Sequence, residues 1–161
     1  MSIFTNADKL IKHSIMVNAP SAAVWDCWTT EEGIRSFFAE DCRIDLRIGG
    51  AYEMYFRKDL PEGQRGSEGC VILSYVPGRM LSFDWNAPNE FPEVRKERTW
   101  VVIQLQATEN KQTQVELFHL GWQEGEEWED VFDYFDNAWQ RVLAWLKRYF
   151  EQDKPQYWYN T

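Results

Sequence analysis

The chain is poor in the residues that build most metal and nucleophilic sites. Its 161 residues hold 2 histidines and 3 cysteines, and Cys27, Cys42 and Cys70 form no CxxC pair. An odd number of widely spaced cysteines is typical of free thiols in a reducing compartment rather than of a disulfide framework. A metal site needs three or four convergent donors, so we expect no metal ion and no cofactor. We interpret the cysteines as buried, inert thiols.

The sequence also lacks a long hydrophobic run and an excess of positive charge. No stretch reaches the roughly 18 to 20 apolar residues of a membrane helix, and residues 1–13 lack the pattern of a signal peptide. Lys and Arg number 17 against 26 Asp and Glu, so the net charge is −9. A field of that sign repels polyanions, which argues against nucleic acid as a partner. We expect a soluble, cytoplasmic protein that does not insert into membranes.

The first 40 residues predict a strand and two short helices. IKHSIMV (11–17) is the strand, and the following Asn-Ala-Pro-Ser is typical of a helix start, since proline is tolerated in a first turn. The helix should bury Val24 and Trp28. Thr30 then indicates a fresh cap for a second helix that buries Ile34, Phe37 and Phe38.

The middle of the chain changes to a period of two, which indicates strands. The expected strands pair through turn residues, Gly49-Gly50 and Pro77-Gly78 among them, and occupy residues 42–48, 51–57, 69–76, 79–85, 99–107 and 114–120. Two polar segments, 58–68 and 86–97, are predicted to be long surface loops.

The last element is a long helix that begins near Glu126 and runs to about Gln152, before Pro155. At about 100° per residue, its apolar side chains fall on one side, and they include Trp128, Val131, Phe132, Phe135, Trp139, Val142, Leu143, Leu146, Tyr149 and Phe150. One long helix laid across so many strands requires a sheet that curves around it. The pattern therefore predicts an α+β fold with an antiparallel sheet of about six to seven strands around one helix.

This order resembles the START-like, helix-grip superfamily, also called SRPBCC. The motifs NAPSAAVWDCWTTEEGIRSFF (18–38), DLRIGGAYEMYF (45–56), EGCVILSYVPGRMLSFDW (68–85) and LGWQEGEEWEDVFDYFDNAWQRVLAWLKRYFE (120–151) are similar to the C-terminal-domain family of the activator of heat shock protein 90 ATPase. The resemblance implies a single START-like domain over 1–161 with its core in 11–151. The tail 152–161 carries Tyr157, Trp158 and Tyr159, which we expect to dock on the sheet or on a second subunit.

His119 is the main candidate for a functional polar side chain. It is in phase with Val115 and Leu117 on a predicted strand and should face inward. Such a histidine is either a satisfied core residue or a polar contact at a cavity wall that orients an apolar guest. In an enzyme it would act as a general acid or base with a carboxylate, Tyr52 or Tyr55 as partner.

Other candidate sites have simpler explanations. The acidic run from Glu124 to Asp136 lacks the spacing and glycine of a calcium loop, and acids are favoured in the first turn of a helix. The serines lack a nucleophile-elbow context, and no cysteine has an adjacent histidine. We assign no catalytic residue.

Three functional classes remain open. The favoured one is a module that binds a small hydrophobic molecule in a cavity between the sheet and the last helix, lined by Met54, Phe56, Phe83, Trp85, His119, Phe135, Trp139 and Leu143. The resemblance also implies a chaperone-linked interaction domain, either an ATPase activator or a stress-response protein. A third class is an enzyme of the cyclase or hydrolase kind. A chaperone and a second copy of the chain are therefore further candidate partners.

Overall fold

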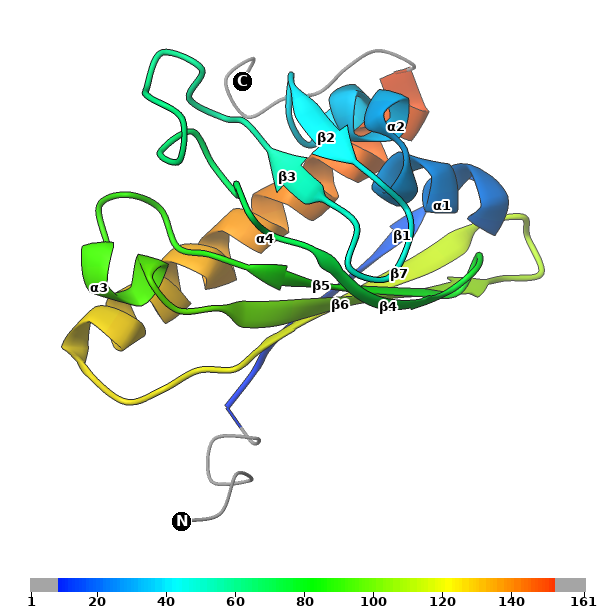
Figure 1. Ribbon diagram of the computed structural model, residues 1–161. Coiled ribbons are helices and arrows are strands. Elements are labelled where there is room, and N and C mark those ends of the chain that lie inside the picture. Colours follow the sequence, from blue (N-terminus) through cyan, green and yellow to red (C-terminus); the bar gives the residue numbers. More distant parts are fainter. Residues whose placement is uncertain (1–8, 153–161) are drawn as a thin grey trace.

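The computed structural model describes residues 9–152 (Figure 1). Its elements follow one another in the order β1 Ile11–Val17, α1 Ser21–Thr29, α2 Glu31–Phe37, β2 Cys42–Ile44, β3 Tyr52–Met54, β4 Ile72–Val76, β5 Met80–Trp85, α3 Pro92–Arg95, β6 Thr99–Ala107, β7 Thr113–Leu120 and α4 Glu126–Gln152. The predicted docking of Tyr157, Trp158 and Tyr159 lies outside the described residues.

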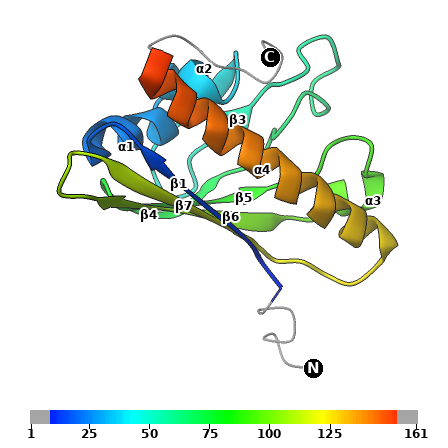
Figure 2. The same ribbon diagram turned by 180° about the vertical axis from the view of Figure 1, so that it is seen from behind.

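A curved antiparallel sheet is the base of the fold. Five strands pair in the order β1-β7-β6-β5-β4, while β2 and β3 form a separate two-stranded sheet. An isolated bridge between Ala51 and Val71 joins the segment before β3 to the start of β4. Helix α4 crosses one face of the large sheet, and α1, α2 and the β2–β3 hairpin lie on the same side of the sheet as this helix (Figures 1 and 2). The predicted helix-grip arrangement is confirmed, with its seven strands divided between two sheets.

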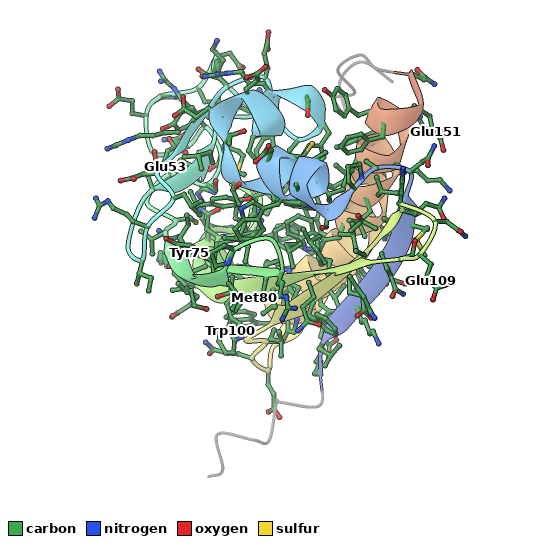
Figure 3. All side chains as sticks on the ribbon, turned by 90° about the vertical axis from the view of Figure 1, so that its right-hand side faces the viewer. Glu53, Tyr75, Met80, Trp100, Glu109 and Glu151 are labelled. Atoms are coloured by element: carbon green, nitrogen blue, oxygen red, sulfur yellow. The ribbon has the colours of Figure 1, made fainter. Side chains whose placement is uncertain are left out.

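Alternation along β6 and β7 sets the position of the core. Val101 and Ile103 on β6 are buried opposite His119 and Leu117 on β7. Their neighbours point to the other face, where Trp100 is 43% exposed (Figure 3). Since successive side chains of a strand point to opposite faces, one face of the sheet packs against the helices and the other meets solvent.

The long helix α4 has the bounds that its apolar periodicity predicts. Its buried side chains recur every three or four residues, and they are Val131, Phe135, Trp139, Val142, Leu143, Trp145 and Leu146. Glu126, Glu127 and Glu129 lie in its first turn, where the helix dipole favours negative charge. Side chains fill the layer between this helix and the sheet (Figure 3).

Two local predictions at turns and caps are confirmed. Thr30 caps α2, and its Oγ1 accepts a hydrogen bond from the backbone N–H of Gly33 at 2.9 Å. Gly78 in the turn between β4 and β5 has a φ of 75°, a conformation that a side chain disfavours and glycine adopts freely. These two residues fix where neighbouring elements change direction.

Two other segments differ from the sequence prediction. The strands expected at 42–48 and 51–57 shorten to β2 and β3, because the chain turns tightly between them and Gly50 N donates to Arg47 O at 2.8 Å. The predicted loop 86–97 contains the short helix α3, with Pro92 in its first turn. Among residues 9–152, no helix combines the length and the apolar character needed to span a membrane.

Candidate functional site

The candidate site is a pocket of about 720 Å³ beside the middle of α4. Its walls come from α4, from the end of β5 and the segment 86–90, from the loop between β3 and β4, and from Phe38 after α2. The pocket is open to solvent at one edge, where its lining includes the exposed residues Arg141 and Asn89. Its size falls within the range of about 300–1,000 Å³ that is typical of small-molecule sites.

Aromatic rings form the floor of this pocket. The ring of Trp139 on α4 lies 5.7 Å from that of Trp85 on β5 and 5.8 Å from that of Phe38, measured between centroids. Phe56 adds a further ring at 5.9 Å from Phe38. Tilted and edge-on contacts at these distances are the favoured arrangements of aromatic pairs. The floor is therefore apolar and closely packed.

A buried histidine holds Trp139 in place. The indole Nε1–H of Trp139 donates to Nδ1 of His119 at 2.9 Å, and Nε2 of His119 lies 2.7 Å from Thr99 Oγ1. An indole can only donate, so Nδ1 must be the acceptor and Nε2 carries the proton. Thr99 Oγ1 in turn donates to the carbonyl oxygen of Trp85 at 3.4 Å. His119 and Thr99 thus connect two tryptophans of the pocket floor.

His119 is a neutral core residue in this arrangement. Its side chain is fully buried, and burial lowers its pKa from 6.5 to about 3. Two of the partners suggested for general acid or base work bond elsewhere, since Tyr52 donates to Trp28 O and Tyr55 donates to Glu53. The two ring nitrogens of His119 are themselves bonded to Trp139 and Thr99.

The eight residues expected to line a cavity divide into two groups. Four of them line the pocket, and they are Phe56, Trp85, Phe135 and Trp139. The other four are buried outside its lining, and they are Met54, Phe83, His119 and Leu143. Phe83, for example, packs against Tyr52 in a tilted arrangement with 4.3 Å between ring centroids. His119 contacts the pocket lining through Trp139 and through Phe135, whose ring centroid lies 5.0 Å from its own.

Polar residues that the sequence did not single out build the wall opposite α4. Asn86 Nδ2 donates to Gly66 O at 3.1 Å, and Asn89 Nδ2 donates to Gln64 O at 2.6 Å. These bonds join the segment after β5 to the loop between β3 and β4. Because both segments were predicted only as surface loops, no periodicity marked their side chains as neighbours.

Arg95 on α3 reinforces the same wall. Its guanidinium donates to the carbonyl oxygens of Ala87 at 2.5 Å, Gly63 at 2.7 Å and Gly66 at 3.0 Å. The side chain is 16% exposed, and burial lowers its pKa. One side chain therefore ties three backbone positions together, which holds the pocket wall in a defined shape.

The remaining candidate groups form no reactive site. The three cysteines are free and buried, and desolvation raises the pKa of Cys27 to about 11 and those of Cys42 and Cys70 to about 12. Glu127 accepts a hydrogen bond from Val94 N at 2.6 Å, so part of the acidic run anchors α3 to α4. Among residues 9–152, no three or more His, Cys, Asp or Glu side chains are placed to hold a metal ion.

Solved structures share this fold at low sequence identity. A protein from Mesorhizobium loti has a TM-score of 0.71 and 15% identity, with 89% of this chain and 98% of that chain covered. The Aha1 dimer from Colwellia psychrerythraea has a TM-score of 0.67 and 21% identity, covering 89% and 96%. An Hsp90 activator from Plasmodium falciparum has a TM-score of 0.64 and 14% identity, covering 84% and 91%. At these identities the likeness shows the fold alone.

A family model gives a more specific assignment than the structures do. A comparison with curated protein sequences found no match. The model of one family, by contrast, matches residues 18–151, which run from the turn before α1 to the last turn of α4. That match includes every segment that lines the pocket. The chain therefore belongs to the family described as "Activator of Hsp90 ATPase homolog 1-like protein".

Proposed function

We propose that the protein binds a small hydrophobic molecule in the pocket beside α4. The observation that supports this most is a space of about 720 Å³ with a floor of aromatic rings and an edge open to solvent. Burial of apolar surface contributes about 25 cal/mol per Å². A ligand would therefore gain affinity mainly where it covers lining rings that still meet solvent, such as the half-buried Phe56 and the exposed Tyr134, because Trp85 and Trp139 are only 3% and 2% exposed. A single binding domain over 1–161 is part of the same proposal.

Mass spectrometry under native conditions tests this proposal on the intact chain. The protein purified from cells, or mixed with the neutral probe N-phenyl-1-naphthylamine, should show a one-to-one complex. The probe's fluorescence should rise on binding, since its environment becomes apolar. A protein with no bound guest and no saturable fluorescence change would contradict the proposal.

A second candidate function is interaction with an Hsp90-type ATPase. It is supported by the family to which residues 18–151 belong and by the neighbour named as an Hsp90 activator. Under this proposal the protein acts in the cytoplasm in a stress response, and its three free cysteines fit a reducing compartment. Pull-down with the ATPase and measurement of its turnover would test it. If the protein neither associates with the ATPase nor changes its rate, this candidate function is wrong.

A second copy of the chain is the other partner that we propose. It is supported by the neighbour from Colwellia psychrerythraea, which is named as a dimer. Light scattering over a range of protein concentrations would show whether the mass doubles. A constant monomer mass at every concentration would exclude this part of the proposal.

Catalysis has less support than either binding function. Among the described residues that line the pocket, Glu90 is the one carboxylate, and histidine and cysteine do not occur. General acid or base catalysis in a closed site commonly needs two such groups within reach of each other. We therefore assign no reaction to the pocket.

A further inference from the structure

The rim of the pocket is positively charged in a protein whose net charge is −9. Four arginines line the pocket, and they are Arg57, Arg65, Arg95 and Arg141. Glu90 is the one acidic residue among the described lining residues, so the local charge is opposite in sign to that of the whole chain. Clefts with apolar walls concentrate the field of the charges around them.

Two of these arginines already have a carboxylate partner. Arg57 pairs with Asp59 at 2.9 Å, and Arg95 lies 3.9 Å from Glu68. Arg65 and Arg141 form no ion pair with any carboxylate of residues 9–152. The positive charge without a partner therefore comes from one residue of the β3–β4 loop and one residue of α4.

Arg65 is held with its terminal nitrogens available. Its Nε donates to the carbonyl oxygen of Leu60 at 2.8 Å, and the side chain is half-buried. A guanidinium has five N–H donors, and the other four of Arg65 meet no acceptor among the described residues. The Leu60 bond fixes the orientation of the group, so an anion could bind it without reordering the side chain.

Arg141 shares the rim with a phenol. Burial, followed by the negative charge of Glu90, raises the pKa of Tyr134, while Arg141 opposes this effect. Glu90, Tyr134 and Arg141 all line the pocket. Tyr134 therefore stays protonated at neutral pH, and its hydroxyl donates to no described residue. It remains available as a neutral donor.

We propose that the pocket selects an amphipathic organic anion, with an aromatic or aliphatic body and a single carboxylate or sulfonate group. This inference rests on the proposed binding function and names the chemical class of the guest. The body lies on the part of the aromatic lining that meets solvent, where Phe56 is half-buried and Tyr134 is exposed. The anionic group is bound by Arg65 and Arg141, and Tyr134 donates a further hydrogen bond. A polyanion is disfavoured because the surrounding surface is acidic.

The charge on the guest should have a measurable effect on its affinity. Hydrogen bonds between a guanidinium and an anion are shorter and stronger than neutral ones. Arg141 is exposed, so part of its attraction is screened by solvent. We expect an anion to bind about tenfold more tightly than a neutral molecule of the same shape, the lower end of the effect of charged hydrogen bonds.

Two fluorescent probes with one aryl skeleton test this inference. N-phenyl-1-naphthylamine is neutral, and 8-anilinonaphthalene-1-sulfonate adds one sulfonate to the same rings. The wild-type protein should bind the sulfonate about tenfold more tightly, and rising salt should reduce the difference. The double variant Arg65→Gln with Arg141→Gln should bind the two probes with equal affinity. The ratio of the two affinities within one variant is the quantity compared, so a general weakening of the pocket does not change the result.

Arg79→Gln is the matched control. Arg79 is exposed, lies between β4 and β5, and is outside the pocket lining. Its substitution removes one positive charge, half of the change in the double variant, and should leave the preference for the sulfonate unchanged. An equal loss in this variant would indicate general attraction to the protein surface and would overturn the inference.

The remaining outcomes separate this inference from the proposed function. If both probes bind with equal affinity, the pocket binds apolar molecules and the anionic class is wrong. If the sulfonate is preferred but the double variant keeps that preference, Arg65 and Arg141 are not its site. If neither probe binds, the proposed function itself fails.

Discussion

Trp139 on α4 and His119 on β7 share a hydrogen bond of 2.9 Å that ties the pocket floor to the centre of the sheet. The connection continues through Thr99 to the carbonyl oxygen of Trp85, so both ends of it belong to the pocket. All the polar atoms of this network are buried and paired. A buried network of this kind makes the position of the rings definite.

Removal of the indole donor should destabilise the protein. In Trp139→Phe, the ring is largely retained while Nδ1 of His119 is left buried without a donor. An unpaired buried polar atom costs about 1–3 kcal/mol. We expect the free energy of unfolding in urea to fall by about that amount, and the neutral naphthyl probe to bind less tightly because the floor ring is no longer fixed.

Trp145→Phe is the control for this change. Trp145 also lies on α4, is buried and lines the pocket, but its indole donates to no described residue. The same substitution here removes the same atoms of the indole without removing a hydrogen bond. Equal losses of stability in the two variants would show that the bond to His119 contributes nothing specific.

The buried His119 should make stability depend on pH in a defined window. Its pKa is about 3 in the folded protein and about 6.5 when it is exposed, so the unfolded state takes up a proton first as the pH falls. The stability that neutral His119 contributes is complete above about pH 6.5 and is lost toward pH 3. The slope is about 1.4 kcal/mol per pH unit.

Comparison with His119→Gln isolates this effect, because all other titrating groups are common to both chains. The free energy of unfolding in urea should be higher for the wild type than for the variant at pH 7, and this difference should fall by about 2 kcal/mol between pH 7 and pH 5. If the variant does not fold, the imidazole nitrogens of the wild type can be followed by NMR, and they should show no protonation above pH 5. A difference in unfolding free energy that does not change with pH, or protonation of His119 near pH 6.5, would show that His119 is not a buried neutral residue.

Arg95 should control the integrity of the pocket wall. Arg95→Met keeps the apolar stem but removes the bonds to Ala87, Gly63 and Gly66. We expect a loss of about 1–3 kcal/mol in unfolding free energy and faster proteolysis within residues 58–68. Arg79→Met, at an exposed site without a side-chain partner among the described residues, should change neither. Proteolysis at the wild-type rate would show that the wall does not depend on Arg95.

The regular elements could be predicted because their burial follows simple periods. Helix α4 keeps its apolar side on every third or fourth residue from Val131 to Leu146, and the structure has it at Glu126–Gln152 as expected. Strand β6 alternates buried residues with exposed or half-buried ones from Thr99 to Gln106. A single buried face is enough to specify each of these elements.

The pocket was harder to predict, because the hydrophobic period of a strand gives the face on which a side chain lies but not how far that side chain is from the pocket. Met54 and Phe83 face inward as their strand phases indicate, yet they pack within the core rather than at the pocket. The distance of an inward residue from the pocket depends on how the layers pack, which no single strand encodes. Arg65 and Arg95 lie in segments without any period, and their bonds to the carbonyl oxygens of Leu60 and Gly63 are visible only in the structure.

The most direct test of the binding function is to fill the pocket from α4. Ala138 is half-buried, lines the pocket and precedes Trp139. Ala138→Phe therefore places a ring in the part of the pocket that the proposed ligand would occupy. Gln140→Phe adds the same ring to an exposed position of the helix outside the lining and serves as the control.

The measurement is the affinity of each variant for N-phenyl-1-naphthylamine, with the circular dichroism spectrum as a check on folding. The account predicts that Ala138→Phe weakens binding at least about tenfold while Gln140→Phe binds as the wild type does. Unchanged affinity in a folded Ala138→Phe variant would show that the pocket beside α4 is not where hydrophobic molecules bind.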